Sequence, residues 1–353
     1  MSYESYSYPM LLHVLTPVVI NTGEAYEPFS ICPGQDEHGV IIRVSELGEF
    51  LSSSRYSRLS EIACLNSLNP NYGSNTYLFR EAKEIISEAL KNAENQGMKD
   101  RINIGKCRIL LEARNALIGN PCRIVSRHAT NPMDEQPYIP GSSIKGAIRT
   151  AILEKLRKEK KPDDLFNKNR MLEAKLLYDE MAHRLEPQKD PLKYLKISDF
   201  VFSDPDNCSR IGKVNASGEI PVYTGMTDAM SFEGKDVIAK GTISIIKQNF
   251  TPDWLSMDFI LEAIDDFYRQ MSDNRLKKNG GKLPVPEKVL NILRADIPQS
   301  GMLRLGHYIG IENVTMNVKN PNPRLDNENG SRRFVTIESG VASGYCLLEV
   351  DKQ

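Results

Sequence analysis

The stretch "YIPGSSIKGAIRT", residues 138–150, decides how the fold is assigned. A proline and a glycine stop the preceding segment, and two serines follow them. After the serines, apolar residues recur at the three- and four-residue spacing of an α-helix, which predicts a helix over residues 143–158. Ser142 or Ser143 is expected to cap this helix, because a serine hydroxyl can accept a hydrogen bond from an unpaired backbone N–H.

The predicted helix start has the chemistry of a phosphate-binding site. Small residues let a phosphate approach the backbone, and the N–H groups of a helix N-terminus attract anions. Lys145 and Arg149 are four residues apart and share one stripe, although a cation there is unfavourable for the helix dipole. A capped surface helix without a ligand is the alternative. The candidate phosphate-binding residues are Gly141, Ser142, Ser143, Lys145, Gly146 and Arg149.

The same stretch does not match an ATP-binding loop. Gly141 and Gly146 have the glycine spacing of such a loop. However, Ala147 and Ile148 stand where the loop needs a lysine and a serine or threonine. The sequence therefore does not favour nucleotide hydrolysis.

A second candidate site lies in "SGMLRLGHYIGIENVTMN", residues 300–317. Its glycines permit close approach of a backbone, and arginine, histidine and tyrosine can contact a phosphate or stack on a base. One interpretation is a glycine-rich loop over residues 301–310 that contacts a phosphate or a base. An ordinary glycine-rich hairpin turn is the alternative. The candidate residues are Arg304, Gly306, His307 and Tyr308.

The remaining pattern predicts an α+β protein. Its strongest elements follow the order strand, helix, strand, strand, helix, strand, which is the ferredoxin-like (RRM-like, βαββαβ) order with large insertions at 24–137 and 273–342. We expect an N-terminal part over 1–204 and a C-terminal part over 205–353, with two ferredoxin-like halves as a variant of this fold. Residues 107–119 fit a strand or a helix equally well. The predicted strands cover 11–20, 193–203, 236–247 and 343–350, and the further predicted helices cover 75–97, 165–185 and 252–272, the last capped by Thr251 and Pro252.

Composition bounds the function further. The 353 residues are 40% hydrophobic and 26% charged, as in soluble globular proteins, and the formal net charge is −1. Basic residues nevertheless gather locally, with seven lysines or arginines against two glutamates over 138–161, which suits one charged ligand on one face. The first residues lack a signal-peptide pattern, no apolar run could span a bilayer, and the six cysteines form no CxxC pair. These features predict a cytoplasmic protein without a zinc site.

Catalytic patterns are sparse. The sequence contains no HxxxH, HExxH or GxSxG motif, so it predicts neither a metal centre nor a serine nucleophile. His13 is a candidate acid–base group and Asp199 a candidate cation ligand, but neither has a catalytic partner nearby in the sequence. We therefore expect no catalytic residues and no cofactor.

Four stretches together resemble the RAMP superfamily of CRISPR proteins. They are "LHVLTPVVINTGE" (12–24), "YIPGSSIKGAIRT" (138–150), "LKISDF" (195–200) and "LRLGHYIG" (303–310), in the order expected of the family. Within the superfamily the chain is most similar to the fifth Csm subunit of type III-A effector complexes. Val19 and Asn21 depart from the histidine and glycine usual after the Thr-Pro pair.

The resemblance implies a non-catalytic subunit that caps the filament of backbone RAMP subunits. It would hold the 3′ part of the guide RNA (crRNA), and so support crRNA maturation and antiviral defence. Its implied partners are the guide RNA, the backbone subunits and recruited nucleases, with no membrane. Two alternatives stay open. The first is a RAMP endoribonuclease with His13 or His307 as its acid–base group, and the second is a terminal RAMP subunit of a Cmr-type or type III-D complex.

Overall fold

The structure of the protein is a computed structural model. Of the helix predicted over 75–97, it describes only Arg80, Glu81, Glu84 and Ile85, and all four are helical. The rest of that helix, residues 165–168 and 179–184 of the helix predicted over 165–185, and Tyr308 lie outside the described residues. The described residues are 4–26, 31–33, 38–42, 58, 61, 80, 81, 84, 85, 104–109, 111–119, 125–133, 136–160, 169–178, 185–203, 209–217, 225–230, 237–278, 285–307, 309, 334–337 and 341–352.

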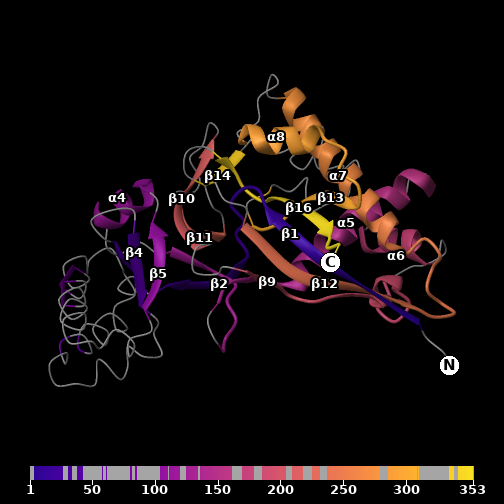
Figure 1. Ribbon diagram of the computed structural model, residues 1–353, viewed down its shortest axis with the longest axis horizontal. Helices are drawn as coiled ribbons and strands as arrows, with labels where there is room; N and C mark the ends of the chain where they lie inside the picture. Colours follow the sequence, from indigo (N-terminus) through magenta and orange to yellow (C-terminus); the bar gives the residue numbers. More distant parts are fainter. Residues whose placement is uncertain are drawn as a thin grey trace.

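A seven-stranded antiparallel sheet forms the larger half of the described structure, and its strand order is β13-β16-β1-β12-β9-β7, with β8 also paired to β12 (Figure 1). The helices α5 to α8 gather on one side of it (Figure 1). Its strands are β1 (Glu4–Val14), β7 (Tyr138–Ile139), β8 (Leu195–Ile197), β9 (Phe200–Phe202), β12 (Val237–Lys247), β13 (Ser300–Arg304) and β16 (Tyr345–Val350). The helices are α5 (Gly141–Lys160), α6 (Asn169–Leu177), α7 (Met257–Lys278) and α8 (Glu287–Arg294), with a short 3₁₀ helix η5 (Pro191–Tyr194).

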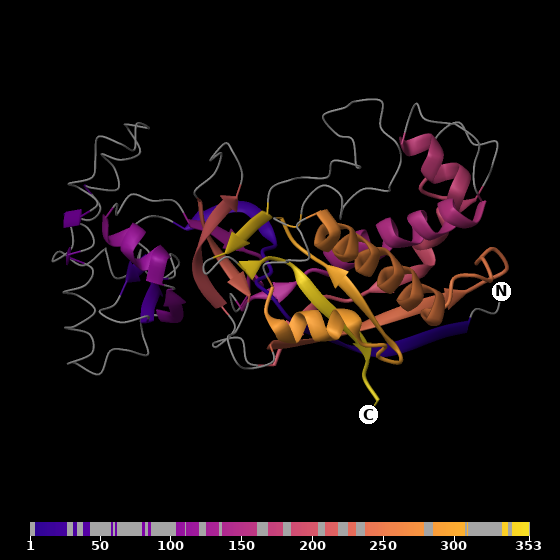
Figure 2. The same ribbon diagram turned by 90° about the horizontal axis from the view of Figure 1, so that it is seen from above.

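A second, mixed sheet of nine described strands lies beside the first (Figure 2). The helix α4 (Leu111–Gly119) contacts it, and a small apolar cluster there includes Ala113, Leu117 and Val125. The strand order is β2-β6-β11-β10-β5-β4-β3, and β14 and β15 extend it from β10. The strands are β2 (Asn21–Tyr26), β3 (Ile31–Pro33), β4 (His38–Ile42), β5 (Ile104–Ile109), β6 (Val125–His128), β10 (Ser209–Ser217), β11 (Gly225–Met230), β14 (Phe334–Ile337) and β15 (Val341–Ala342).

The elements predicted for the core are present in the predicted order along the chain, as β1, α5, β8 and β9, β12, α7 and β16. The chain is thus a mixed α/β protein with mainly antiparallel sheets, as expected. The ambiguous residues 107–119 contain both structures, because β5 ends at Ile109 and α4 begins at Leu111.

Several predicted boundaries are wrong. The strand predicted over 11–20 begins at Glu4 and ends at Val14, and the strand predicted over 193–203 is interrupted after Ile197. The helix predicted to open at Thr251 begins at Met257, where the backbone N–H of Phe259 donates to Ser256 Oγ over 3.2 Å. The Thr251 hydroxyl instead donates to the carbonyl oxygen of Ile246 over 2.9 Å and closes the turn after β12.

The core lies between the first sheet and its helices. Alternate residues of β1, from Met10 to Val14, are buried, and β12 repeats this period from Val237 to Ile245. The buried helix stripes pack against this face, with Ile144 and Ile148 in α5 and Ile260, Ile264 and Phe267 in α7. Full burial of each such side chain contributes about 1.5–3 kcal/mol, so this interface is a main source of stability.

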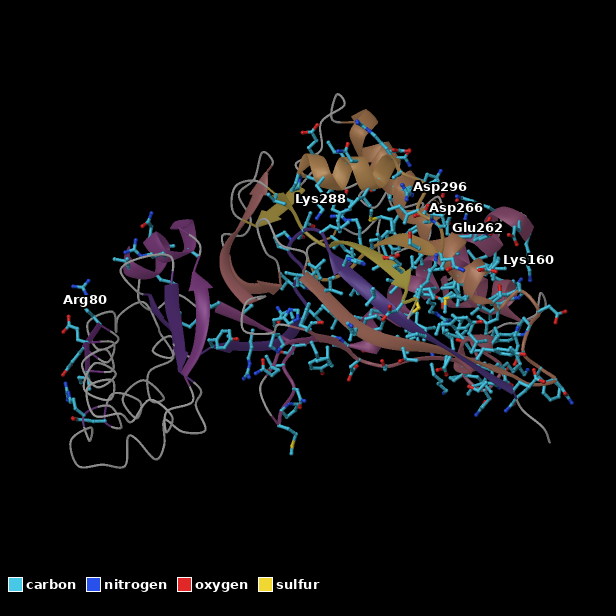
Figure 3. All side chains as sticks on the ribbon, viewed as in Figure 1. Arg80, Lys160, Glu262, Asp266, Lys288 and Asp296 are labelled. Atoms are coloured by element: carbon cyan, nitrogen blue, oxygen red, sulfur yellow. The ribbon has the colours of Figure 1, made fainter. Side chains whose placement is uncertain are left out.

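An ion-pair group joins the two main helices at their outer surface. Lys155 Nζ of α5 lies 2.7 Å from Glu262 Oε1 and 3.9 Å from Asp266 Oδ2 of α7. Figure 3 shows Glu262 and Asp266 on the outer side of α7. No helix in the described ranges is long and apolar enough to cross a membrane.

The predicted boundary at residue 204 does not separate the two sheets. The first sheet joins β1 to β12 and β16, and the second joins β6 to β11, so each sheet takes strands from both sides of that residue. As a division into folding units, 1–204 and 205–353 stays a prediction.

Residues 15–19, which we call the Thr-Pro segment, are held by hydrogen bonds to the start of β16. The backbone N–H of Tyr345 donates to Thr16 Oγ1 over 2.9 Å, and the N–H of Leu15 donates to the Tyr345 carbonyl oxygen over 2.9 Å. The N–H of Gly344 donates to the Pro17 carbonyl oxygen over 2.8 Å. Thr16 is buried, so its hydroxyl is a structural acceptor and not a surface group.

The other side of the Thr-Pro segment contacts the turn at Gly306. The backbone N–H of His307 donates to the Val19 carbonyl oxygen over 2.8 Å. Gly306 has a φ of 106°, and a Cβ at this position would lie 2.6 Å from that carbonyl oxygen. Both the left-handed backbone and the close approach therefore require glycine.

We predict opposite stability effects for two glycines. Gly306→Ala should lower the free energy of unfolding by about 1–3 kcal/mol, because φ is positive and Val19 lies in the way. Gly146→Ala should raise it by about 0.5–1 kcal/mol, because Gly146 is helical and its added Cβ would meet nothing within 4 Å. Urea unfolding of both variants tests this, and equal effects would contradict the structural role of Gly306.

Candidate functional site

A pocket of ≈ 400 Å³ lies where the two predicted motif stretches meet. One wall comes from α5, and another wall comes from the end of β13 and the turn after it. The end of the Thr-Pro segment and the residues after it line the third side. The residues from these three parts include Ser143, Gly146 and Thr150; Arg304, Gly306 and His307; and Val19, Ile20 and Asn21.

The helix wall is formed by Ser143, Gly146, Ala147 and Thr150. Their spacing of three, four and seven residues puts them on one face of α5. Gly146 is exposed, and a Cβ at this position would meet nothing within 4 Å. The pocket is therefore bounded here by bare helix backbone.

The two predicted cations of this helix do not line the pocket. Lys145 Nζ donates to the Leu195 carbonyl oxygen over 2.8 Å. Arg149 donates to Asp190 Oδ2 over 2.6 Å and to Glu173 Oε2 over 2.8 Å, and so joins α5 to η5 and α6. Both side chains are partly buried and make intramolecular contacts that the sequence did not reveal.

The pKa values of these two groups follow from those contacts. Burial and the neighbouring Lys196 lower the pKa of Lys145. Burial also acts to lower the pKa of Arg149, but its hydrogen bonds to Glu173 and Asp190 outweigh this and raise it. Arg149 is therefore a firmly charged link between three elements.

The start of α5 is not capped by Ser142 or Ser143, although the sequence predicted such a cap. The Pro140 carbonyl oxygen accepts the first helical hydrogen bond, from the Ser143 N–H over 2.9 Å. Ser142 and Ser143 lie inside the first turn, so the predicted serine cap is wrong. The Gly141 N–H donates to Asp199 Oδ1 over 2.8 Å, and a Cβ on Gly141 would lie 2.4 Å from the Ile197 carbonyl oxygen.

Asp199 thus brings a carboxylate to the helix N-terminus, where the dipole favours a negative charge. Its contact explains the break between β8 and β9, since the helix start sits directly against this bend. A cation-binding role for Asp199 finds no support in the described ranges, which hold no group of three or more His, Cys, Asp or Glu suited to a metal ion.

The second predicted stretch is a strand before it is a loop. Residues 300–304 form β13 and pair with β16, so the loop expected over 301–310 begins only after Arg304. Gly301 packs against α7, because a Cβ there would lie 2.5 Å from Ile264 Cγ1. His307 is exposed beside the pocket.

Arg304 is only 2% exposed. Its Nη2 donates to the Ser343 carbonyl oxygen over 2.7 Å, and its guanidinium carbon lies 4.4 Å from the ring centroid of Tyr345. Its Nε has no hydrogen-bond partner among the described residues. Burial lowers the pKa of Arg304.

Tyr268 of α7 is a pocket residue that sequence reasoning assigned to the core alone. It is fully buried, and its hydroxyl donates to the Ala147 carbonyl oxygen over 3.2 Å. It belongs to an apolar helical stripe, so no sequence signal separates it from its core neighbours. Thr150 and Ile20 were missed for a similar reason, because each belongs to an ordinary helix or strand pattern.

The two histidines considered as acid–base groups occupy different settings. His13 Nε2 lies 3.1 Å from Glu349 Oε2, and the two residues belong to the adjacent strands β1 and β16. His307 lies at the pocket. The buried His128 holds the pocket rim, because its Nδ1 accepts from the Ile20 N–H over 3.1 Å and its Nε2 lies 3.0 Å from the Tyr138 carbonyl oxygen.

The family model of the RAMP superfamily matches residues 11–306, which confirms the resemblance found in the sequence. Among curated proteins, the chain is similar to the "CRISPR system Cms protein Csm5" of Methanocaldococcus jannaschii, with 30% identity over 202 residues. That alignment covers 51% of this chain and 46% of the relative, so the chain spans about half the length of the curated relative it matches.

Two solved structures share the fold. One belongs to the cryo-EM structure of a Csm–crRNA–target RNA ternary complex in a type III-A CRISPR–Cas system, with a TM-score of 0.65, 18% identity, and coverage of 98% of this chain and 100% of that chain. The other is the crystal structure of T. onnurineus Csm5, with a TM-score of 0.61, 19% identity, and coverage of 95% and 99%. Identities this low show the shared fold alone.

We predict that His128 makes the fold sensitive to acid. Burial lowers its pKa from 6.5 to about 4, so the folded protein keeps it neutral while the unfolded chain takes up a proton. Stability is complete above pH 6.5 and falls, as the pH drops from there towards 4, by at most about 1.4 kcal/mol per unit.

The matched control is His128→Gln, which cannot titrate but keeps an amide donor. The free energy of unfolding of both proteins, measured in urea across this pH window, should diverge as the pH falls. Parallel curves would show that His128 is not held neutral in the folded state.

Proposed function

The chain belongs to the RAMP superfamily, and from this premise we propose that it is a non-catalytic, RNA-binding subunit of a type III CRISPR effector complex. It caps the filament of backbone RAMP subunits, holds the 3′ part of the crRNA, and supports crRNA maturation and antiviral defence. The main support for this proposal is that two stretches resembling the family, far apart in the sequence, line one pocket. The first contributes Ser143 and Gly146, and the second contributes Gly306 and His307.

The proposed RNA contact extends from the pocket to the neighbouring side of α5. Ser142 is exposed there, and Lys145 lies near Lys196 of β8, close enough for its pKa to be lowered. Such cations neutralise phosphates without reading bases, which is what a subunit must do when guide sequences vary. Arg149 contributes to RNA binding indirectly. Because Glu173 and Asp190 already pair with its guanidinium, it holds α5 in position and does not itself bind a phosphate.

The proposed core is ferredoxin-like. The strand order β16-β1-β12-β9, with α5 and α7 as the connecting helices, supports this reading of the first sheet. In this view β13 and β7 are additions at its two edges, and the second sheet combines strands of the two insertions with β10 and β11, which lie between β9 and β12 in the chain.

The similarity to proteins named Csm5, and to a chain of a type III-A Csm complex, supports the assignment to a Csm complex of type III-A. The fold shared with a chain of a Csm–crRNA–target RNA complex supports crRNA and Csm backbone subunits as partners. We place the protein in the cytoplasm with that complex, and assign cleavage to other subunits or recruited nucleases. A terminal subunit of a Cmr-type or type III-D complex is the nearest alternative assignment.

One observation favours a second function. The close pairing of His13 with Glu349 could orient an imidazole as a general base, as an endoribonuclease would need. The pair lies between two sheet strands and is not among the residues that line the pocket. A role in bracing β1 against β16 therefore accounts for it equally well, and we prefer the non-catalytic function.

We predict that the purified chain binds single-stranded RNA of unrelated sequences with similar affinity. The affinity should fall with salt, with a slope of about 0.7 for each phosphate contact. Lys145→Met should weaken binding and lower this slope, whereas Lys158→Met, at the other end of α5, should change both little. Filter binding gives both quantities, and strong preference for one sequence would contradict a backbone-holding role.

We also predict that the chain cleaves neither guide precursor nor target RNA, with or without divalent metal. The reason is that, among the described residues that line the pocket, no paired acid–base group is present. Gel analysis of labelled RNA measures this directly. Cleavage that disappears in His13→Ala or His307→Ala would replace the proposed function with the endoribonuclease.

A further inference from the structure

Within the part of the chain that the structure describes, Arg304 carries a charge that no carboxylate balances. It is 2% exposed, and no carboxylate pairs with it within the described residues. A carbonyl oxygen and an aromatic ring take up part of its charge, and Nε donates to none of the described residues. A buried cation is expensive unless an anion compensates it, so its position beside the pocket points to an anionic ligand.

The helix wall is built to let a ligand come close. Gly146 sits inside α5, where glycine costs helix stability relative to alanine. No neighbour requires its small size, because a Cβ there would meet nothing within 4 Å. Gly306, by contrast, is required by its backbone. Gly146, whose presence in α5 no neighbouring residue explains, therefore lines the same pocket as Arg304.

The pocket has the size and chemistry for one unit of an RNA chain. Its volume of ≈ 400 Å³ falls within the roughly 300–1,000 Å³ of small-molecule sites. Apolar side chains of Val19, Ile20 and Ile309 stand beside hydroxyls of Ser143 and Thr150. Such a lining suits a sugar or base attached to a charged group better than a bare ion.

Building on the proposed function, we propose that this pocket takes a single nucleotide of single-stranded RNA, with its phosphate paired to the Arg304 guanidinium and its remainder lying against the bare backbone at Gly146. Arg304 and Gly146, which are far apart in the sequence, thus contact the same nucleotide. The site captures one nucleotide among the several that the subunit holds.

The experiment uses the full chain, a labelled single-stranded oligouridine and, separately, inorganic phosphate. Arg304→Met removes the charge at similar length, and Gly146→Leu fills the pocket while favouring the helix. Each should raise the Kd for RNA about tenfold and lower the salt slope by about 0.7, the value of one phosphate contact. The double variant should lose little more than either single one, because both changes remove the same contact.

Lys158→Met is the matched control, since it removes a positive charge from the exposed end of the same helix. RNA should raise the melting temperature of the wild type more than that of either pocket variant. Inorganic phosphate that stabilises the wild type, while RNA binding is equal in all variants, would assign the pocket to a free anion and overturn the RNA proposal.

The outcomes separate this inference from the proposed function. A wild type that binds no RNA refutes the proposed function itself. A wild type that binds RNA, together with a folded Gly146→Leu that has the same Kd and salt slope, refutes the pocket alone. If Arg304→Met fails to fold, Gly146→Leu decides by itself, because an added Cβ at Gly146 meets nothing within 4 Å and leucine favours the helix.

Discussion

The backbone hydrogen bonds of the Thr-Pro segment are the constraint on which the rest of the structure depends. Between Leu15 and Val19 the chain leaves β1. It is hydrogen-bonded on one side to the start of β16 and on the other to the turn at Gly306. These contacts bring the end of β13 to the same pocket as the first turns of α5. The glycine turn and the pocket therefore both depend on one short irregular stretch, in which Pro17 has no N–H to continue the strand and Thr16 Oγ1 accepts from the Tyr345 N–H.

Much of the main architecture could be read from the sequence because it is carried by local periodicity. The stripes of α5 and α7 and the alternation of β12 belong to single elements, and each needs only its own residues to be recognised. The predicted ends of helices and strands were wrong where the end is set by a hydrogen bond that the sequence pattern does not reveal. Ser256 starts α7 in place of Thr251, whose hydroxyl is occupied by the preceding strand, and that competition cannot be seen in a list of residues.

The candidate site shows the same limit more sharply. The sequence identified both walls of the pocket, but it treated all cations near them as equivalent. The structure separates them by partners distant along the chain. Arg149 is paired with Glu173 and Asp190, whereas Arg304 is buried beside Tyr345 and pairs with no carboxylate among the described residues. The two glycines of the pocket also differ in their surroundings. An added Cβ would meet nothing within 4 Å at Gly146 but would lie 2.6 Å from the Val19 carbonyl oxygen at Gly306.

The pairing of β1 with β16 has a consequence for how the protein is made. Leu12 meets Leu348 across these strands, so a central strand acquires its second neighbour only after more than 300 further residues have left the ribosome. Until then that edge of β1 is exposed on the nascent chain, and unpaired edges invite association with other polypeptides. Early protection of that edge, as chaperones provide, would therefore favour correct folding of the nascent chain.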